Sequence, residues 1–201
     1  MSEHDHDHEH DHDHEHEHDE PEEDARAEAE AEARRRFALG QIRQYGDPAL
    51  RLVAHEVVEF DDDLRRLVDR MTTLMHEAQG VGLAATQVGV LRRLFVFDPD
   101  GEGSRVIVNP VVVATKDETA TDDEGCLSLQ GVRVPVERAV GITLEGKDAN
   151  GEDVRWELDE YGSRVVQHEL DHLDGVLIID RTDDERRKEA LSTLRPRAVL
   201  R

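Results

Sequence analysis

The stretch VVQHELDHLDGVL, Val165 to Leu177, carries two histidines four residues apart and a glutamate directly after the first. On a helix this spacing places His168 and His172 on one face, where their ring nitrogens can reach one metal ion. Glu169 lies one step round the helix, so it can exchange a proton with water beside the metal without being a ligand. The alternative is an ordinary amphipathic helix with polar residues. The stretch predicts a helix under either interpretation.

A third ligand is better sought upstream than downstream. Three downstream acids, Asp180, Asp183 and Glu185, stand at the start of a separate helix that reads as solvated. Upstream, Cys126 follows Gly125 in DDEGCLSLQG, and a thiolate with two imidazoles and one open position is a catalytic arrangement. Such a thiolate favours Fe²⁺ or Zn²⁺ over Mg²⁺ or Ca²⁺. The alternative for a single cysteine is a small buried apolar residue.

The rest of the body contains both helix patterns and strand patterns. Between Asp61 and Gly80, apolar residues recur at intervals of three or four residues, which predicts a helix with Gly80 at its C-terminal cap. TDDERRKEALSTL predicts another helix. Strands are expected in RLFVFD, SRVIVNP, VRVPVERAVGITLEGKD and VRWELD, the last two around an Asn150-Gly151 turn. Strands that cluster between helices without regular alternation favour an α+β fold.

The first 36 residues differ from the body that follows. They hold 16 acidic and 4 basic side chains, a charge of −12 out of the total of −23. Eight of the twelve histidines alternate with acids from His4 to His18, and no apolar group there can join a core. We therefore predict a disordered His/Asp/Glu-rich tail over residues 1–36, with nascent helix in AEAEAEA, and a catalytic domain over residues 37–201.

Composition also excludes several classes of partner. The body is acidic in its own right, so direct nucleic-acid binding is not expected. No apolar run approaches the ~20 residues of a membrane span, and no cationic start precedes an apolar run as in a secretory signal. With one cysteine no intrachain disulfide can form, which fits a reducing cytoplasm.

Three stretches together resemble the signatures of the peptide deformylases. They are GVGLAATQ (Gly80 to Gln87), EGCLS (Glu124 to Ser128) and QHELDH (Gln167 to His172), in the family's order and with compatible spacing. The resemblance extends from Ile42 to Asp180. It implies a hydrolase that removes the formyl group from N-formylmethionyl nascent peptides. It also implies an α+β fold, with antiparallel sheets packed around a central helix that carries the HExxH motif.

The resemblance also implies roles for single residues. The metal would be one divalent ion, natively Fe²⁺ with Zn²⁺, Ni²⁺ or Co²⁺ as alternatives, held by Cys126, His168 and His172. Glu169 would be the general acid and base. The formyl oxygen would be held, as it becomes an oxyanion, by the side chain of Gln87 and the backbone N–H of Leu127. Glu124 is expected to orient a ligand histidine or to pair with Arg138.

Substrate binding is predicted from neighbouring positions. Tyr161 and Val165 precede His168 by seven and three residues, so they share its helical face. Val81 lies beside the glycines of the first motif, where Gly82 leaves room for the substrate backbone. Arg133 is expected near the later residues of the peptide. The expected partners are formylmethionyl nascent chains and the ribosome surface, and the protein is expected to be a cytoplasmic monomer.

Two other functions remain open at this point. A metallopeptidase that cuts internal peptide bonds shares the HExxH motif, but it has no need of Cys126 as a ligand. A non-enzymatic metal buffer would use the histidine-rich tail as its binding segment. Substitution of Cys126 separates the first alternative from a deformylase, and removal of residues 1–36 separates the second.

Overall fold

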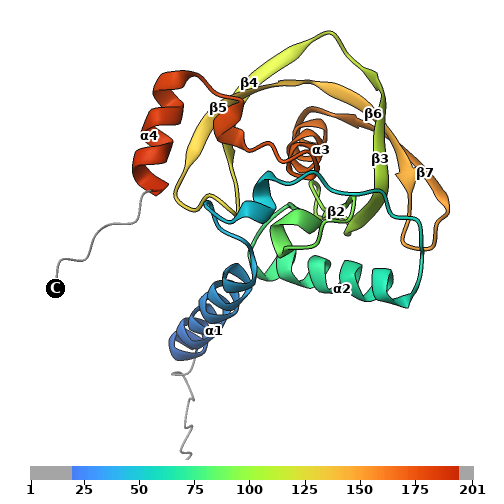
Figure 1. Ribbon diagram of the computed structural model, residues 1–201. Coiled ribbons are helices and arrows are strands. Elements are labelled where there is room, and N and C mark those ends of the chain that lie inside the picture. Colours follow the sequence, from blue (N-terminus) through green and yellow to red (C-terminus); the bar gives the residue numbers. More distant parts are fainter. Residues whose placement is uncertain (1–19, 195–201) are drawn as a thin grey trace, which may run out of the picture.

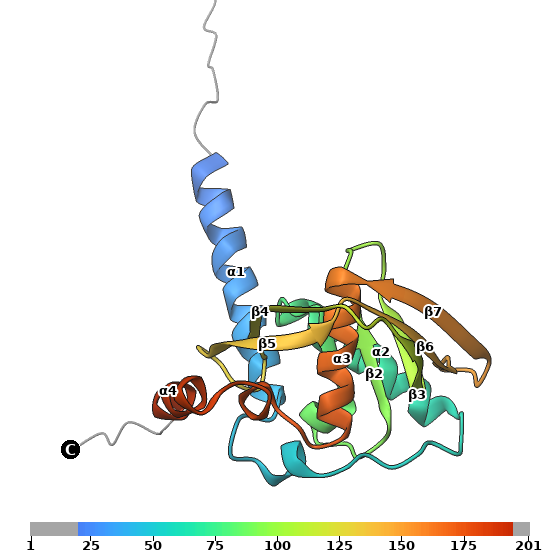
Figure 2. The same cartoon turned by 90° about the horizontal axis from the view of Figure 1, so that it is seen from above.

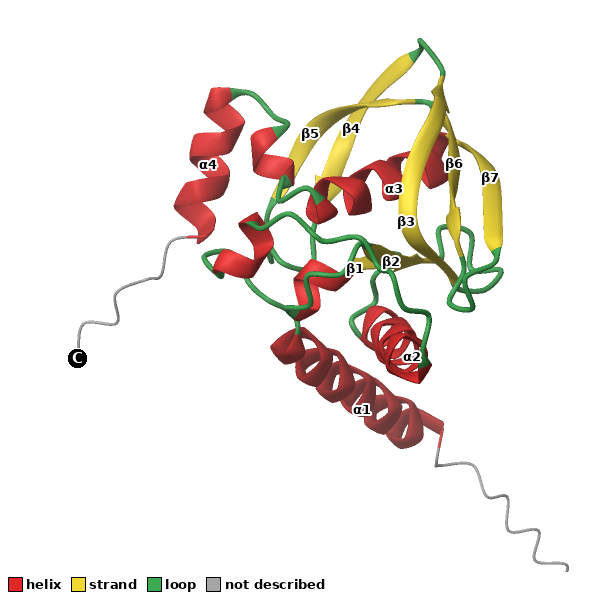
Figure 3. Cartoon of the chain, turned by 45° about the vertical axis from the view of Figure 1, so that its right-hand side comes forward, coloured by secondary structure: helices red, strands yellow, loops and turns green. Residues whose placement is uncertain are grey.

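Two antiparallel sheets curve around the helix that carries the histidine pair (Figure 1). The computed structural model describes residues 20–194, and this helix, α3, spans Glu160–Leu173. The larger sheet has the order β1-β2-β3-β6-β7, with strands Gly82–Ala84, Leu94–Phe97, Arg105–Thr115, Gly141–Lys147 and Asp153–Asp159. The smaller sheet pairs β4, Thr119–Gly125, with β5, Arg133–Ala139. The predicted α+β fold is confirmed, with α3 enclosed by strands of both sheets (Figure 3).

The apolar face of α3 fixes the helix in the core. Val165, Val166 and Leu173 are buried and belong to one cluster with Phe95 and Phe97 of β2. Burial of each such aliphatic side chain stabilises the fold by roughly 1.5–3 kcal/mol. The helix therefore has little freedom to shift, and the polar side chains on its other face keep a defined position.

Helix α2, Asp62–Glu77, packs on β1 and β2. The Asp61 side chain caps its first turn by accepting a hydrogen bond of 2.9 Å from the Leu64 N–H. The sequence predicts an end at a Gly80 cap, but the left-handed residue is Gln79, with φ of 58°. Gly80 instead permits close packing of two loops, because a Cβ atom there would lie 2.7 Å from Leu127 Cδ1.

Strand β4 is not predicted by the sequence. Its residues, TATDDEG, are polar and almost all exposed, so they lack the apolar alternation that marks a strand. Pairing with β5 specifies the strand instead, in unbroken register from Thr119 opposite Ala139 to Gly125 opposite Arg133. Cys126 follows the last residue of β4 directly, so the strand positions it.

Helix α1, Glu20–Gln41, crosses the boundary that the sequence predicts at residue 36. It projects from the body, and only its last turns are covered, with Ala38 and Leu39 buried against the core (Figure 2). Exposed ion pairs run along it, such as Arg26 with Glu30 at 3.0 Å. The predicted nascent helix in AEAEAEA is therefore part of a full helix. The histidine-rich segment predicted to be disordered, His4 to His18, lies outside the described residues.

Three short 3₁₀ helices and α4 complete the part of the chain that the structure describes. They are η1 Pro48–Arg51, η2 Ala85–Val88, η3 Ile178–Asp180 and α4 Asp184–Leu194, the last beginning two residues later than predicted. Asp180 joins them, because it pairs with Arg51 of η1 and lies 3.3 Å from Arg187 of α4. Over residues 20–194 no helix combines the length and the apolar character that a membrane crossing requires.

Candidate active site

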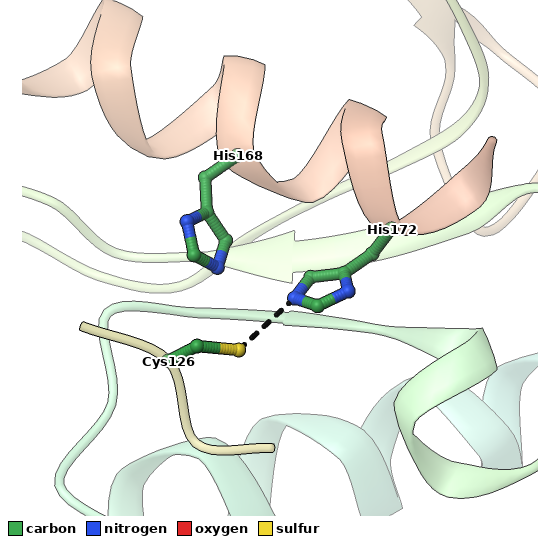
Figure 4. Close-up of side chains that lie close together, drawn as sticks. All are labelled: Cys126, His168 and His172. Carbon is green, nitrogen blue, oxygen red and sulfur yellow. Dashed lines mark hydrogen bonds between the residues drawn. The ribbon is translucent and has the colours of Figure 1, made fainter. Parts of the chain in front are cut away.

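Three possible metal ligands converge below α3 (Figure 4). His168 and His172 project from the helix, and Cys126 reaches them from the end of β4. Their ligand atoms all lie within 4.8 Å of one another, and Cys126 Sγ is 3.2 Å from His172 Nε2. The structure therefore brings together the three residues that the resemblance assigns to the metal.

The geometry and chemistry of this trio fit a divalent ion. Tetrahedral coordination with metal–sulfur and metal–nitrogen bonds of about 2.3 and 2.1 Å places the ligand atoms roughly 3.5 Å apart. The observed separation of 3.2 Å between Sγ and Nε2 is close to that value. One thiolate and two imidazoles suit a metal of intermediate softness. A first-row transition ion is the group that these three side chains fit.

Glu124 holds the first histidine in place. Its Oε2 atom lies 3.0 Å from His168 Nδ1, which turns Nε2 of the ring toward Cys126 (Figure 4). Burial alone would raise the pKa of Glu124, but the hydrogen bonds with His168 and Arg138 outweigh it and lower the pKa to about 2. The carboxylate is thus charged at neutral pH and accepts the Nδ1 proton of the imidazole. Both roles expected for Glu124, orienting His168 and pairing with Arg138, occur together.

Arg138 ties this carboxylate to the histidine helix. Its guanidinium binds both oxygens of Glu124 at 3.0 Å and donates a third bond, of 2.6 Å, to Asp171 of α3. All three side chains are at least nine-tenths buried, and fork-to-fork pairs of this kind are strong and directional. Arg164 binds Glu124 at 2.8 Å, and Arg181 binds Asp171 at 2.6 Å.

Sequence reasoning missed Asp171, Arg164 and Arg181 as parts of this network. Asp171 stands between the two histidines in ELDH, but nothing in the pattern shows that it is buried or which cation meets it. Its two partners come from a strand 33 residues upstream and a turn 10 residues downstream. Only the folded chain brings these charges together.

Glu169 is enclosed beside the ligands. It is 4% exposed, and Oε2 has no hydrogen-bond partner among the described residues. Burial raises the pKa of Glu169 to about 7, although the charge of His168 opposes the rise. Gly82 makes room for it, since a Cβ atom there would lie 2.8 Å from the Glu169 carboxyl carbon. Gly82 is expected from the sequence to leave room for the substrate backbone. In the structure, the space that a side chain at Gly82 would fill is occupied by the carboxyl group of Glu169.

The two expected oxyanion donors flank Cys126. Gln87 is 1% exposed, and its Oε1 accepts a bond of 2.8 Å from the Ala84 N–H, which fixes the direction of its amide. Its Nε2 then lies 3.1 Å from Ser128 Oγ and 3.7 Å from Cys126 Sγ. The N–H of Leu127 donates no hydrogen bond within the described part of the chain. Gln87 therefore directs a donor toward Cys126, and the Leu127 N–H, one residue after Cys126, is not used by the described part of the chain.

A cavity of about 630 Å³ opens onto this group. Every residue predicted to act on substrate lines it, namely Val81, Gly82, Gln87, Leu127, Arg133, Tyr161, Val165 and Glu169. Cys126 and His168 also line it, whereas His172 does not and is almost fully buried. Val165 is only 6% exposed, and Tyr161 is 53% exposed. The cavity also has a wall that sequence reasoning missed, formed by Arg35 and Leu39 of α1.

Known proteins are similar to this chain over most of its length. The family described as polypeptide deformylase matches residues 39–188. A peptide deformylase of Thermotoga sp. (strain RQ2) is 45% identical over 147 residues, which cover 73% of this chain and 89% of that protein. Peptide deformylase 1 of Corynebacterium glutamicum is 43% identical over 164 residues, covering 80% and 97%. The crystal structure of peptide deformylase from Thermotoga maritima superimposes with a TM-score of 0.69 at 45% identity, covering 71% of this chain and 96% of that one.

Proposed function

The chain belongs to the polypeptide deformylase family, and on that premise we propose how its own residues perform the reaction. It is an enzyme that hydrolyses the N-terminal formamide of formylmethionyl peptides and releases formate. The observation that carries the assignment of residues is the meeting of Cys126, His168 and His172 beside Glu169 in one cavity. We assign the first three to the catalytic metal and Glu169 to proton transfer.

A divalent metal held by Cys126, His168 and His172 would supply a Lewis acid and would lower the pKa of water to about 7. Glu169 lies where it can accept a proton from the attacking water and deliver it to the departing amine. A carboxyl group with a pKa near neutrality suits both halves of such a transfer, because it neither holds nor releases its proton too strongly.

Gln87 and Leu127 stabilise the charge that develops on the formyl oxygen. The side-chain amide of Gln87 is held by Ala84 and Ser128, so its N–H needs no reorientation when the oxyanion forms. The Leu127 N–H is the second donor, one residue after the metal-binding cysteine. Each donor of this kind contributes about 3 kcal/mol to transition-state stabilisation.

The methionine side chain is proposed to bind among Val81, Tyr161 and Val165. Val165 is buried in the cavity wall one turn before His168, so an apolar side chain that enters there stays near the ligands. Arg133, further along the wall, is assigned to the later residues of the peptide. The test compares formyl-Met-Ala with formyl-Gly-Ala. Val165→Asp is expected to abolish the preference for methionine, and a preference that survives would remove Val165 from the pocket.

We propose Fe²⁺ as the native metal. The thiolate of Cys126 favours Fe²⁺ or Zn²⁺, and Ni²⁺ or Co²⁺ would also satisfy this set of ligands. Metal analysis of protein purified without oxygen identifies the ion. A thiolate ligand is also oxidisable, so we expect peroxide to inactivate the enzyme purified in this way.

We further propose that the enzyme acts in the cytoplasm as a monomer, on chains that emerge at the ribosome surface. The support is its substrate, because formylmethionyl chains arise during translation. Sedimentation velocity measures the oligomeric state, and co-sedimentation with ribosomes measures the association.

The decisive experiment follows formate release from formyl-Met-Ala. Cys126→Ser separates a deformylase from a metallopeptidase of the HExxH kind, because only the former uses the thiol as a ligand. We expect this variant to lose both bound metal and formate release. Full metal content in the variant would contradict the assignment of Cys126.

A further inference from the structure

The substrate cavity continues beyond the part of the chain that matches the deformylase family. That match begins at residue 39, whereas the cavity wall also includes Arg35, one turn earlier on α1. Residues four apart on a helix lie on the same face, so Arg35 and Leu39 face the cavity together. The N-terminal helix thus adds to the active site a surface that the family match does not contain.

The position of Arg35 is fixed by the buried end of its helix. Ala38 and Leu39 are 0% and 7% exposed, and they join the core cluster formed by α2, β1 and β2. Arg35 precedes this anchor by only three residues, so its backbone is held although most of α1 projects into solvent (Figure 2). The cavity therefore has an ordered cation at this wall.

The guanidinium of Arg35 retains hydrogen-bonding capacity. Its Nε is buried and has no partner among the described residues. Its ion pair with Glu32 is long, at 3.7 Å between Nη1 and Oε2, and both side chains are partly exposed. The neighbouring Arg34 and Arg36 are exposed and do not line the cavity. Among these three arginines, Arg35 is the one placed to meet a ligand.

The charges that line the cavity indicate that the ligand of Arg35 is a carboxylate. Glu124 is neutralised by Arg138 and Arg164, Glu169 lies beside the metal ligands, and Asp123 adds an exposed carboxylate to the wall. On the wall provided by β5, Arg133 donates a bond of 3.0 Å to the backbone oxygen of Asp123. Two arginines from different elements, Arg35 and Arg133, thus line a passage for a peptide whose first residue is held near the metal ligands. A guanidinium recognises a carboxylate best, because its planar fork matches the two oxygens.

We propose that Arg35 is a specificity-determining residue that favours peptides with a glutamate or aspartate one to three positions after the formylmethionine. The inference rests on the proposed function of the same site, because the peptide must enter with its formyl end at the metal ligands. It extends that function to a residue supplied by the N-terminal helix.

The test compares kcat/KM for pairs of formylmethionyl tetrapeptides that differ only in Glu against Gln, at the second, third or fourth residue. The full-length enzyme should prefer Glu at one of these positions. Arg35→Gln should reduce that preference about twofold to fivefold, the range of a partly exposed ion pair. Arg35→Glu should reverse the sign and favour Lys over Gln at the same position. High salt should weaken the preference in the wild-type enzyme.

Arg36→Gln is the matched control, since it removes the same charge from the same helix away from the cavity. It should leave the ratio for Glu against Gln unchanged. The inference is overturned if Arg35→Gln lowers kcat/KM equally for both peptides, which indicates a purely structural role. It is also overturned if the wild type shows no preference at any position. A wild-type enzyme that releases no formate at all would refute the proposed function, and the inference with it.

Discussion

Helices α3 and α1 both face the substrate cavity, but they are held in opposite ways. Helix α3 is enclosed by strands, and its buried Asp171 is paired with Arg138 and Arg181 from elsewhere in the chain. Helix α1 is exposed along most of its length, and its ion pairs are local and solvated. Buried charges are costly when a partner is lost, whereas solvated pairs contribute little. The difference indicates that the chemistry depends on the enclosed helix and that selectivity can be added from the exposed one.

The sharpest test of this contrast is Glu169→Gln on α3. Glutamine has nearly the same shape but cannot move the proton, so kcat should fall by roughly 10²–10⁴-fold. Metal content should stay at the wild-type level, as measured on the same preparation. Glu160→Gln, at the exposed start of α3, is the control and should leave kcat unchanged. Loss of metal from Glu169→Gln would make Glu169 a ligand and contradict its role as the base.

Next in size is Glu124→Gln, which tests whether the buried network supports the metal. The change leaves Arg138 and Arg164 short of a countercharge and weakens the hold on His168. We expect metal affinity to drop about 10-fold or more and the free energy of unfolding to fall by about 3 kcal/mol. Chelator competition and urea unfolding measure the two effects. Asp122→Asn, exposed on the same strand, should change neither the metal affinity nor the free energy of unfolding. Unaltered metal affinity in Glu124→Gln would show that the buried network does not support metal binding.

A smaller effect is expected at Asp180, which supports the far end of α3 through Arg51 and the Leu177 N–H. Burial alone would raise the pKa of Asp180, but these hydrogen bonds and the arginine charge lower it below 3.8. A lowered folded-state pKa means that the stabilisation is complete above the unfolded value and is lost as pH falls through the folded one.

Asp180→Asn should therefore cost about 1 kcal/mol or less at pH 7, because the pair is partly exposed. The difference from wild type should shrink progressively below about pH 4, as urea midpoints at a series of pH values would show. A difference that stays constant throughout the acid range would show that packing, and not the charge, accounts for it.

The smallest effect on catalysis is expected from removal of residues 1–19, since all eight tail histidines precede α1. Turnover with saturating metal should be unchanged because Arg35 and Leu39 remain. Only neutral imidazole binds a metal, so metal binding by the tail should decline on acidification. Calorimetric titration with Zn²⁺ should give a lower stoichiometry for the shortened chain. Equal stoichiometry would mean that the tail binds no metal.

Most of the site residues on α3 could be predicted from the sequence, whereas the contribution of α1 to the cavity could not. The relative placement of His168, Glu169 and His172 follows from their spacing on a helix, and the resemblance of the three motifs indicated Cys126, Gln87 and Leu127. These residues lie close together as expected, because the reaction requires these residue types next to one another in the site. The fold class followed from the same elements, since strands clustered between helices leave few arrangements.

What the sequence could not show depends on contacts distant along the chain. Polar TATDDEG becomes a strand only through β5, and Asp171 is buried only because Arg138 and Arg181 neutralise it. The boundary at residue 36 relied on composition, which signals solvation but does not exclude a solvated helix. For the same reason nothing in RRRFALG set Arg35 apart from its neighbours. Its orientation results from the burial of Leu39.

The bidentate pair of Arg138 and Glu124 crosses from β5 to β4, and the third bond of Arg138 reaches α3. The β4–β5 hairpin therefore cannot separate from the helix without breaking the bond from Arg138 to Asp171 and the contact of Glu124 with His168, which would release His168 and Cys126 from each other. Local opening of the hairpin and metal binding are consequently linked equilibria. A bound ion raises the free energy of that opening by RT ln(1 + [metal]/Kd), about 2.7 kcal/mol at a hundredfold excess over Kd. The amide protons of β4, β5 and α3 should then exchange with solvent as one cooperative unit, slowed by metal, while those of α1 exchange independently of it.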